Sequence, residues 1–451
     1  MPRTPQDNVA LRLLLAQAGW TGEEFARAVN AVGRESGLRL HYQRASVSQW
    51  LSGTRPRPPV PLLIAEALSR RLGRPVDPVE AGLAGAGAGG FGSGGVGSDG
   101  ASSDGTSGDG AEARYAPGLL RAGAAVYRTA DLELLPPRPG VVRPRRPVEG
   151  GGERLGGRHV ACVEELTAQF SYSDHLTGSG TVLRALSGFT TSVALPWLRL
   201  SASPVTRRSL LGSCARLVTL GGFLHLDHGR NGTAQRWYLT AAELADESGE
   251  PKTLALVLRA LSVQAHRLGH HEAALRLADR ALSVAGRSDP RTLALLHGQL
   301  ALARASVGRH REAVGAIRQA ERELDRATGP WPSIGGYNAA ALAHQRAEVR
   351  QRIGDRAGAL SDLRLSTRLR PAQEPRAQAL VLARLGELHL EAGELDAACL
   401  AWERFLSLRT GLRSRRIDEA QAAMRAALLP HRRSPHASHL LNSRSTGGFR
   451  P

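Results

Sequence analysis

Hydrophobic residues recur with a helical period along most of the chain. Within residues 42–59, Val47, Trp50 and Leu51 follow one another at i, i+3 and i+4, so they share one face of a short helix. Gly53 comes directly after this stripe, where a helix end favours a left-handed backbone, and the proline-rich stretch that follows stops the helix. The pattern predicts a short helix with one buried face and one polar face.

Three further amphipathic segments surround this helix. Thr21 and Glu24 have the spacing of a capping box, in which each side chain bonds to the backbone N–H of the other residue. Helical periods also run through residues 8–18 and 62–72. We therefore expect residues 1–84 to form a small helical bundle that presents the short polar helix.

The polar face of the short helix has the chemistry of a DNA reader. Arginine pairs well with guanine and glutamine with adenine, while arginines in an extended exit can meet phosphates. The connection before the helix, about residues 33–43, is longer than a standard helix-turn-helix turn, so the docking geometry stays open. The alternative is a helical dimerisation module that binds no DNA. The predicted DNA-binding residues are Arg44, Ser46, Ser48, Gln49, Arg55 and Arg57.

The composition changes abruptly after residue 83. Residues 84–113 are nearly all Gly, Ala, Ser and Asp, and such a segment buries too little apolar surface to offset its ordering entropy. We predict a flexible Gly/Pro-rich linker over residues 85–157, with a short helix at 114–130. Whether residues 114–135 dock on a folded domain is left open.

From residue 158 to about 430 the chain reads as repeated helical hairpins. Glycines at a helix–helix turn recur at spacings of 40, 39, 46 and 39 residues, and each is followed five positions later by an alanine. Hairpins of the tetratricopeptide type need small residues at such places so that their two helices can approach closely. The pattern predicts a solenoid of stacked hairpins. The glycines are Gly229, Gly269, Gly308, Gly354 and Gly393, and the alanines are Ala234, Ala274, Ala313, Ala359 and Ala398.

We make three local predictions for the solenoid and the turn that precedes it. Its concave face would bind a peptide or protein, with Arg216, Arg259 and His266 as weak candidates for ligand contacts. The extra length before the fourth repeat falls at residues 329–332, which we expect to be a loop insertion. Ahead of the repeats, the glycine-rich turn at 173–180 is either a plain interhelical turn or a phosphate site at a helix N-terminus.

Composition supports a helical fold and a polyanionic partner. The chain has 451 residues, which suits two or three domains, and its aromatic content of 4% with abundant Ala and Leu favours helices over sheets. The net charge of +18 favours nucleic acid electrostatically. Lys252 is the only lysine, which points to a GC-rich genome as one source of the arginine excess.

Several other classes of protein find no support in the sequence. The three cysteines are widely spaced, as for small buried residues in a reducing cytosol, and no secretory signal or membrane-spanning run is evident. No catalytic, cofactor-binding or metal-binding motif is present, so we expect no enzyme, no cofactor and no bound metal. We predict that the tail at residues 431–451, which contains His431, His436 and His439, is basic and disordered.

Four segments together resemble a known family. They are Gly19-Trp20-Thr21, then Ser46-Val47 with Trp50-Leu51-Ser52-Gly53 and Pro56-Arg57-Pro58, then Asp174 with Gly178-Ser179-Gly180, and finally the repeats over residues 217–406. The chain resembles actinobacterial regulators that join an XRE-like helix-turn-helix domain to a tetratricopeptide solenoid, including the Nsd-type negative regulators of sporulation and antibiotic production.

The resemblance implies an all-α protein with three parts: a small N-terminal helix-turn-helix bundle, a flexible linker and a C-terminal solenoid. It also implies a cytoplasmic transcriptional regulator that binds double-stranded DNA. A single small bundle binds weakly, so we expect a homodimer on paired half-sites, with a peptide or protein in the solenoid groove and no membrane partner. The alternative is a scaffold or sequestering protein that acts through its solenoid without sequence-specific DNA binding.

Overall fold

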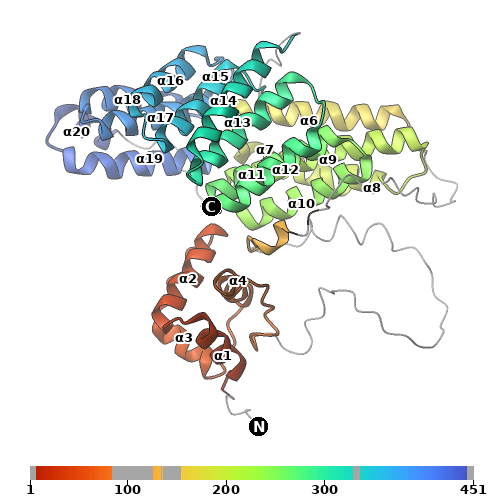
Figure 1. Ribbon diagram of the computed structural model, residues 1–451, viewed down its shortest axis with the longest axis vertical. Coiled ribbons are helices and arrows are strands. Elements are labelled where there is room, and N and C mark those ends of the chain that lie inside the picture. The colour runs from red at the N-terminus through yellow and green to blue at the C-terminus, as the bar shows by residue number, and fades with distance from the viewer. Residues whose placement is uncertain (1–6, 84–124, 134, 136–153, 329–335, 444–451) are drawn as a thin grey trace. The chain divides into compact units, whose positions relative to one another are not determined.

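The computed structural model describes residues 7–83, 125–133, 135, 154–328 and 336–443 (Figure 1). All regular elements in these ranges are helices, as the sequence predicts. The chain divides into two compact units. The first contains residues 1–135 with a short piece at 230–233, and the second contains the rest of the chain.

The first unit is built on four helices at the predicted places. The predicted capping box is present, because Thr21 Oγ1 accepts from Glu24 N at 3.3 Å and Glu24 Oε2 accepts from Thr21 N at 2.8 Å. Gly53 has φ of 93°, the left-handed conformation predicted after the short helix. The helices are α1 (Val9–Ala18), α2 (Gly22–Glu35), α3 (Arg44–Leu51) and α4 (Val60–Leu72).

An aromatic cluster joins α2 to α3 in the core of this unit. The Trp50 ring meets the rings of Phe25 and Tyr42 edge-on, with centroids 6.2 and 5.0 Å apart. Val47 and Trp50 are buried, and Leu51 is half-buried, so the predicted apolar stripe of α3 faces the bundle. Buried aromatic pairs of this kind fix a short helix that its own hydrogen bonds would not hold.

The second unit consists mainly of helical hairpins, each with a first helix A and a second helix B. Most hairpins pack tightly within themselves and against the next one along the chain. The five predicted hairpins are α9 (Pro204–Asp227) with α10 (Asn231–Ser248), α11 (Pro251–Arg267) with α12 (His271–Ala285), α13 (Pro290–Ser306) with α14 (His310–Asp325), α15 (Ala339–Arg352) with α16 (Arg356–Leu369), and α17 (Pro375–Glu391) with α18 (Leu395–Arg409).

The predicted glycine–alanine pattern is confirmed in all five hairpins. Every turn glycine lies between helix A and helix B with φ between 70° and 88°, a conformation that strains any side-chain-bearing residue. Each alanine five positions later is completely buried. The pattern therefore marks real turns and real points of close helix approach.

A second small residue, seven positions before each turn glycine, completes this packing. The clearest case is Gly386, where an added Cβ would lie 2.4 Å from Nε1 of Trp402 on the facing helix B. The indole Nε1 donates to Ala383 O at 3.1 Å, so the large ring is both packed and satisfied. These positions are Gly222, Ser262, Ala301, Ala347 and Gly386, and all are buried.

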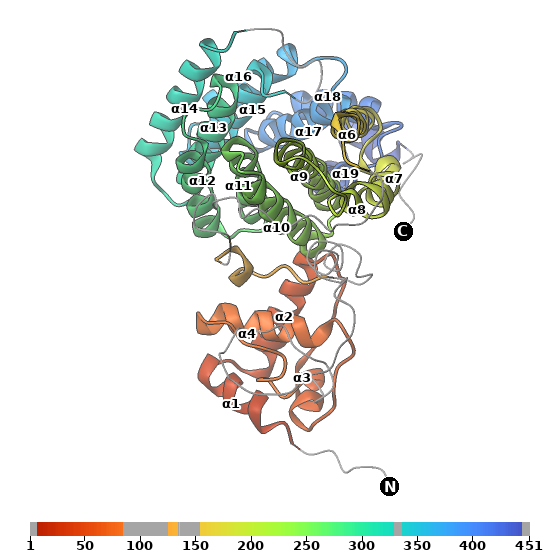
Figure 2. The ribbon, with the colours of Figure 1, turned by 90° about the vertical axis from the view of Figure 1, so that its right-hand side faces the viewer.

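The array closes on itself through the hairpin that precedes the repeats. This hairpin is α6 (Gly157–Thr177) and α7 (Ser179–Phe189), and α6 packs against both α9 and α17 (Figure 2). Arg413 N donates to Thr177 O at 2.8 Å, and Gly180 N donates to Arg413 O at 3.0 Å. The turn at 173–180 is thus a joint occupied by backbone from the other end of the array, which supports the interhelical turn over the phosphate site.

Buried polar contacts reinforce this closure. Arg376 of α17 donates to Asp174 of α6 at 2.5 Å, and both side chains are almost fully buried. Asp227, at the end of α9, accepts from Ser179 Oγ at 2.6 Å and from Ser414 Oγ at 3.0 Å. Contacts between residues about two hundred positions apart therefore link the first helices of this unit to the last.

The predicted disordered tail is partly wrong. After α19 (Arg415–Leu428) the chain forms a short 3-10 turn and then α20 (Pro435–Asn442). Ala437 and Leu440 are buried in the same hydrophobic cluster as α17 and α18. These apolar contacts fold the segment in spite of its basic composition, and residues 444–451 lie outside the described ranges.

The predicted linker helix is mostly absent from the residues that the structure describes. The helix expected at 114–130 does not extend over residues 125–129, and only Ala130–Leu132 form a 3-10 turn, η1. The predicted insertion at 329–332, and residues 114–124, lie outside the described part of the chain.

Helix α9 is long and apolar enough to cross a membrane by length and composition alone, but 72% of its most apolar window is buried among other helices.

Candidate nucleic-acid interface and solenoid inner face

Helix α3 presents a polar, exposed face to solvent. Val47 and Trp50 hold the opposite face in the core, which leaves Arg44, Ser48 and Gln49 exposed. Ser46 is only half-buried. The helix therefore displays the predicted base-reading side chains on the side away from the bundle.

The connection before α3 is ordered by a side-chain clamp. Asn30 Nδ2 donates to Tyr42 O at 2.8 Å, and Tyr42 N donates to Asn30 Oδ1 at 2.9 Å. Gly33 allows close packing of this connection, because an added Cβ would lie 2.5 Å from Leu40 Cδ1. The connection is longer than a standard turn, yet these contacts fix where α3 begins.

The candidate DNA-binding side chains are available for a ligand. Within the described residues, the side chains of Arg44, Arg55 and Arg57 make no hydrogen bond or ion pair, and all three are exposed. Ser48 Oγ donates to Arg44 O at 3.1 Å, which leaves its lone pairs free to accept. The arrangement supplies donors for base edges on α3 and for phosphates on its exit segment.

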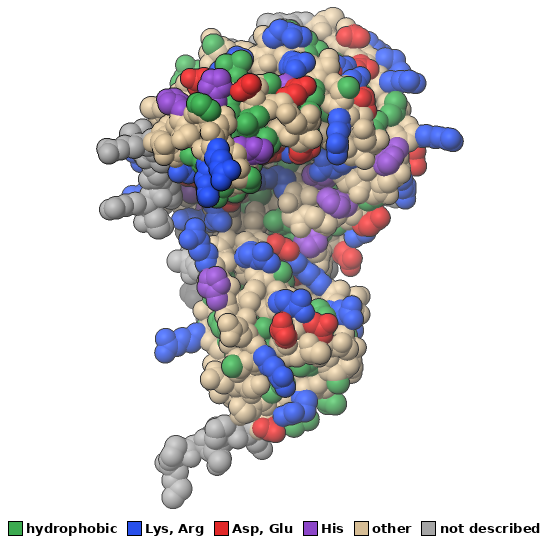
Figure 3. All heavy atoms as spheres, turned by 90° about the vertical axis from the view of Figure 1, so that its left-hand side faces the viewer, with side chains coloured by type: hydrophobic (Ala, Val, Ile, Leu, Met, Phe, Trp, Pro, Cys, Tyr) green, Lys and Arg blue, Asp and Glu red, His purple; other side chains and the backbone are tan. Residues whose placement is uncertain are grey.

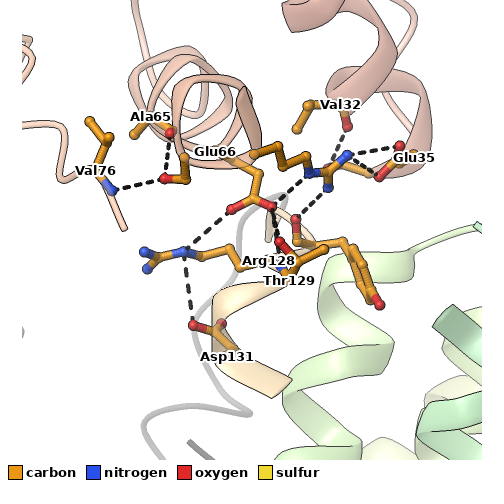
Figure 4. Close-up of polar contacts among 12 residues, drawn as sticks. Val32, Glu35, Ala65, Glu66, Val76, Arg128, Thr129 and Asp131 are labelled. Atoms are coloured by element: carbon orange, nitrogen blue, oxygen red, sulfur yellow. Dashed lines mark hydrogen bonds and ion pairs between the residues drawn. The ribbon is translucent and has the colours of Figure 1, made fainter. Parts of the chain in front are cut away.

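Part of the predicted linker is packed on the same unit through the buried carboxylate of Glu66 (Figure 4). Its Oε1 accepts from Arg70 Nε at 2.8 Å and from Thr129 N at 3.1 Å, and Arg128 Nε lies 3.9 Å from Oε2. Arg70 also donates to the carbonyl of Tyr127 at 3.3 Å. These bonds engage the backbone N–H of Thr129 and the backbone carbonyl of Tyr127 and hold the segment against α4 in a non-helical conformation.

Surface charge alone does not locate the interface. On the face drawn in Figure 3, Lys and Arg side chains are dispersed among acidic and neutral ones. A net charge of +18 is therefore compatible with nucleic-acid binding but does not assign it to one patch.

Two of the three residues predicted to contact a solenoid ligand contact other residues of the protein instead. Arg216 bonds to Glu164 at 2.7 Å and to Glu250 at 3.2 Å, joining α9 to its neighbours. His266 is buried, and its Nε2 lies 3.1 Å from Nη2 of Arg352 on α15. Burial, followed by the nearby Arg352 charge, lowers the His266 pKa to about 4, so the ring is neutral at pH 7. Both residues have clear structural roles.

The third predicted contact, Arg259, differs from the other two. Within the described residues, its side chain makes no hydrogen bond or ion pair, and its Nε is buried without a partner. Burial lowers the pKa of its guanidinium, while Tyr337, Tyr238 and Glu348 oppose that shift. Arg259 is thus a cation on an inner helix that no described residue of its own unit neutralises by direct contact.

Sequence reasoning missed the residues that accompany Arg259. Arg416 on α19 also lacks a direct partner among the described residues, and burial, then the charge of Arg267, lowers its pKa to about 10. His344 and Glu348 lie one helical turn apart on α15, and both interact electrostatically with Arg416. No local motif marks this group, because α19 lies beyond the five recognisable repeats. We call Arg259, His344, Glu348 and Arg416, which these electrostatic interactions connect, the inner cluster.

His436 of the tail makes a contact with an acidic residue of α18. His436 Nδ1 lies 3.1 Å from Asp396 Oδ1, and a small pocket beside them is also lined by Cys399, Glu403 and His439. Within the described residues, no group of histidine, cysteine and acidic side chains has the arrangement needed to hold a metal ion. The contact instead ties α20 to α18.

Comparison with known proteins identifies one sequence match, within the first unit. A family model described as the SP15 N-terminal domain matches residues 11–84, which is a minor part of the chain. A search of curated proteins found no match.

The chain is similar to two solved structures at low sequence identity. The crystal structure of BtubC (BKLC) from P. vanneervenii has a TM-score of 0.34 and 16% sequence identity, and the match covers 56% of this chain and 91% of that one. A crystal structure of Rap protein complexed with competence and sporulation factor has a TM-score of 0.43 and 11% identity, and covers 63% of this chain and 84% of that one.

Proposed function

We propose that this protein is a cytoplasmic, DNA-binding transcriptional regulator whose solenoid binds a peptide or protein and modulates DNA binding. The observation that carries the proposal is the two-sided character of α3. Val47 and Trp50 anchor the helix, while Arg44, Ser48 and Gln49 are exposed and free to meet base edges.

In this proposal α3 enters the major groove and its exit segment follows the backbone. Arg44 reads guanine and Gln49 reads adenine, while Ser46 and Ser48 supply shorter contacts. Arg55 and Arg57 bind phosphates and set the register of the bundle on the duplex. A homodimer would pair two such bundles on two half-sites, which raises affinity over that of one small unit.

The solenoid would act by changing which arrangements of the protein bind DNA. A ligand shifts such an equilibrium only if it binds one arrangement more tightly than another. The contacts of Glu66 with Arg128 and Thr129 hold part of the linker on α4, and α4 packs against α2, which in turn packs against α3. This packed segment lies in the chain between α4 and the solenoid, so we propose that a signal carried along the chain passes through it.

The test is a pull-down of fragmented host DNA with the full-length protein and an Arg44→Ala/Gln49→Ala variant. Arg318→Ala serves as the control, because Arg318 is exposed on α14 and has no direct partner among the described residues. We expect a recurrent sequence with the wild type and the control, and its loss in the double variant. Arg44→Ala alone should cost about 1–3 kcal/mol on the specific site. Unchanged specific binding in the double variant would refute the assignment of α3.

The alternative function is a scaffold or sequestering protein that acts through the solenoid. The observation in its favour is the long connection before α3, which departs from a standard helix-turn-helix. The salt dependence of binding separates the two functions. A regulator binds its own site with a steep salt dependence and far more tightly than random DNA, whereas a scaffold shows only weak, sequence-independent binding.

A further inference from the structure

Helix α1 carries apolar side chains on the face that it turns to solvent as well as on the face that it buries. Its only polar residues are Arg12 and Gln17. Val9 and Leu13 are each 60% exposed, although the outer face of a surface helix is normally polar. The buried face of the same helix consists of Leu11, Leu14, Leu15 and Ala18.

The exposed apolar residues of α1 form one continuous stripe. Val9, Leu13 and Ala16 lie at i, i+4 and i+7, a spacing that places them next to one another on one face of the helix, and all three are exposed. We call these three residues the outer stripe. Single exposed apolar residues are common on protein surfaces, whereas a continuous apolar patch is typical of an interaction site.

The orientation of the outer stripe is fixed at the start of α1. Asn8 caps the helix, because its Oδ1 accepts from Leu11 N at 3.0 Å, and its Nδ2 donates to Ala81 O at 3.0 Å. Asn8 N also donates to the carbonyl of Leu51, the last residue of α3, at 2.8 Å. A partner bound to the outer stripe would therefore be held in a fixed position relative to α3.

The charge beside the outer stripe is compensated. The chain has a net charge of +18, so two copies repel each other overall. Arg12 is the only charged residue of α1, and its Nη2 lies 3.3 Å from Oδ2 of Asp7. Two copies that meet through α1 would thus bring together apolar surfaces that are bordered by neutral pairs. This surface suits a second copy of the chain and presents no unpaired cation to a polyanion.

We propose that the outer stripe binds the outer stripe of a second copy, with the two α1 helices antiparallel about a two-fold axis at Leu13. In this arrangement Leu13 of one copy packs against Leu13 of the other. Val9 of each copy lies beside Ala16 of the other, so a larger side chain meets a small one at both ends of the contact. Both halves of the contact are the same surface, as a two-fold dimer requires. The proposal rests on the homodimer of the proposed function and names the surface that forms it.

The contact is small, so we expect the dimer to be weak without DNA. Helix α1 has 10 residues. A helix of this length is about 15 Å long, and a pair of such helices buries less than the roughly 1,200 Å² of a stable complex. Two neighbouring half-sites on DNA would raise the effective concentration of one copy for the other. In free solution the dimer therefore forms transiently, and its detection requires a covalent trap.

The experiment measures disulfide formation between full-length molecules under copper–phenanthroline oxidation, without DNA. Packed helices with axes about 8–10 Å apart bring facing residues at a two-fold axis within reach of a disulfide. Leu13→Cys should therefore form covalent dimers about tenfold faster than Leu369→Cys, which alters an exposed leucine on α16. The wild type gives the background from the native cysteines. Equal rates for the two variants would overturn the proposal and leave the outer stripe to a different protein.

A second pair of variants ties the cross-link to the outer stripe. Val9→Asp, added to Leu13→Cys, places a carboxylate in the apolar contact, and we expect cross-linking to slow about fivefold. Val205→Asp is the matched control, because Val205 is 66% exposed in the first turn of α9, as Val9 is exposed in the first turn of α1. Both substitutions should leave the melting temperature nearly unchanged, since both side chains are exposed. An unchanged rate with Val9→Asp would show that the cysteines meet by random collision and would overturn the proposal.

These measurements separate the outer stripe from the DNA-reading role of α3, because no DNA is present. Normal cross-linking together with no specific sequence in the DNA pull-down would refute only the role of α3. A specific sequence in the pull-down together with no cross-linking would refute only the contact through the outer stripe.

Discussion

Both units carry arginines that make no hydrogen bond or ion pair with any described residue, but the surroundings of these arginines differ. In the first unit, Arg44, Arg55 and Arg57 extend into solvent from α3 and its exit. In the second, Arg259 and Arg416 lie on inner helices with most of their surface covered. An unpaired arginine therefore costs little folding free energy in the first unit and considerably more in the second.

Because of this difference, an unpaired arginine has a different meaning in the two units. A hydrated arginine costs little folding free energy. An exposed arginine that is available for a ligand is therefore compatible with DNA binding but does not by itself indicate it. An enclosed arginine without a partner lowers the free energy of unfolding, because it loses hydration and gains no bond in return. The proposal of DNA binding for the first unit therefore rests on the geometry of α3 and not on the availability of its arginines.

The largest expected effect comes from making a third enclosed arginine unpaired. Asp174→Ala removes the partner of Arg376, and breaking such a buried pair typically costs about 3–5 kcal/mol in the free energy of unfolding. Chemical denaturation of the full-length protein measures the change. Asp396→Ala is the control, because its pair with His436 is exposed and contributes little. Equal effects of the two substitutions would contradict the contrast between enclosed and exposed charges.

The next effect is a pH dependence caused by His266. Burial lowers its folded-state pKa to about 4, below the unfolded value, so the unfolded state binds the extra proton between about pH 6.5 and 4. Stability should therefore fall as the pH decreases through this window, with His266 contributing about 2–3 kcal/mol. Denaturation of wild type and His266→Gln across this range measures the contribution. His436→Gln alters an exposed histidine and should leave the wild-type slope unchanged.

The smallest effect on stability is expected for the exposed arginines. Replacing Arg55 and Arg57 by Ala should change the free energy of unfolding by about 0.5 kcal/mol or less, because both side chains are hydrated and unpaired. DNA binding should weaken across all sequences, and the salt slope should fall by about 1 for each lost phosphate contact. A titration over salt concentration measures this slope. Strong destabilisation with an unchanged slope would show that these residues support the bundle.

The sequence predicted features that depend on neighbouring residues. Thr21 and Glu24 form a capping box across one helical turn, and the turn glycines and buried alanines lie five residues apart. Such features are encoded within single hairpins or caps, where spacing determines contact. The exposed face of α3 was predictable for the same reason, since Arg44 and Ser48 lie four residues apart on one face, and Val47 and Trp50 lie three apart on the buried face.

Features that join distant segments were not predictable in this way. Glu66 and Thr129 are 63 positions apart, and Asp174 and Arg376 are 202 apart, so no periodicity relates them. The tail was misread because its apolar residues, Ala437 and Leu440, are few and their burial depends on a cluster built by earlier helices. Arg259 and Arg416 lie on α11 and α19, 157 positions apart, and that neither makes an ion pair with a described residue becomes visible only in the structure.

The closure of the helical array restricts the gain or loss of hairpins in this protein. An open solenoid tolerates the duplication or loss of a hairpin, because each unit contacts only its immediate neighbours. Here the first and last helices must also meet, through Thr177 with Arg413 and Asp174 with Arg376. An inserted or deleted hairpin would rotate and shift Thr177 and Asp174 relative to Arg413 and Arg376, and these contacts would be lost. The number of hairpins is therefore fixed by geometry, and inheritable variation in size is confined to the turns and the linker.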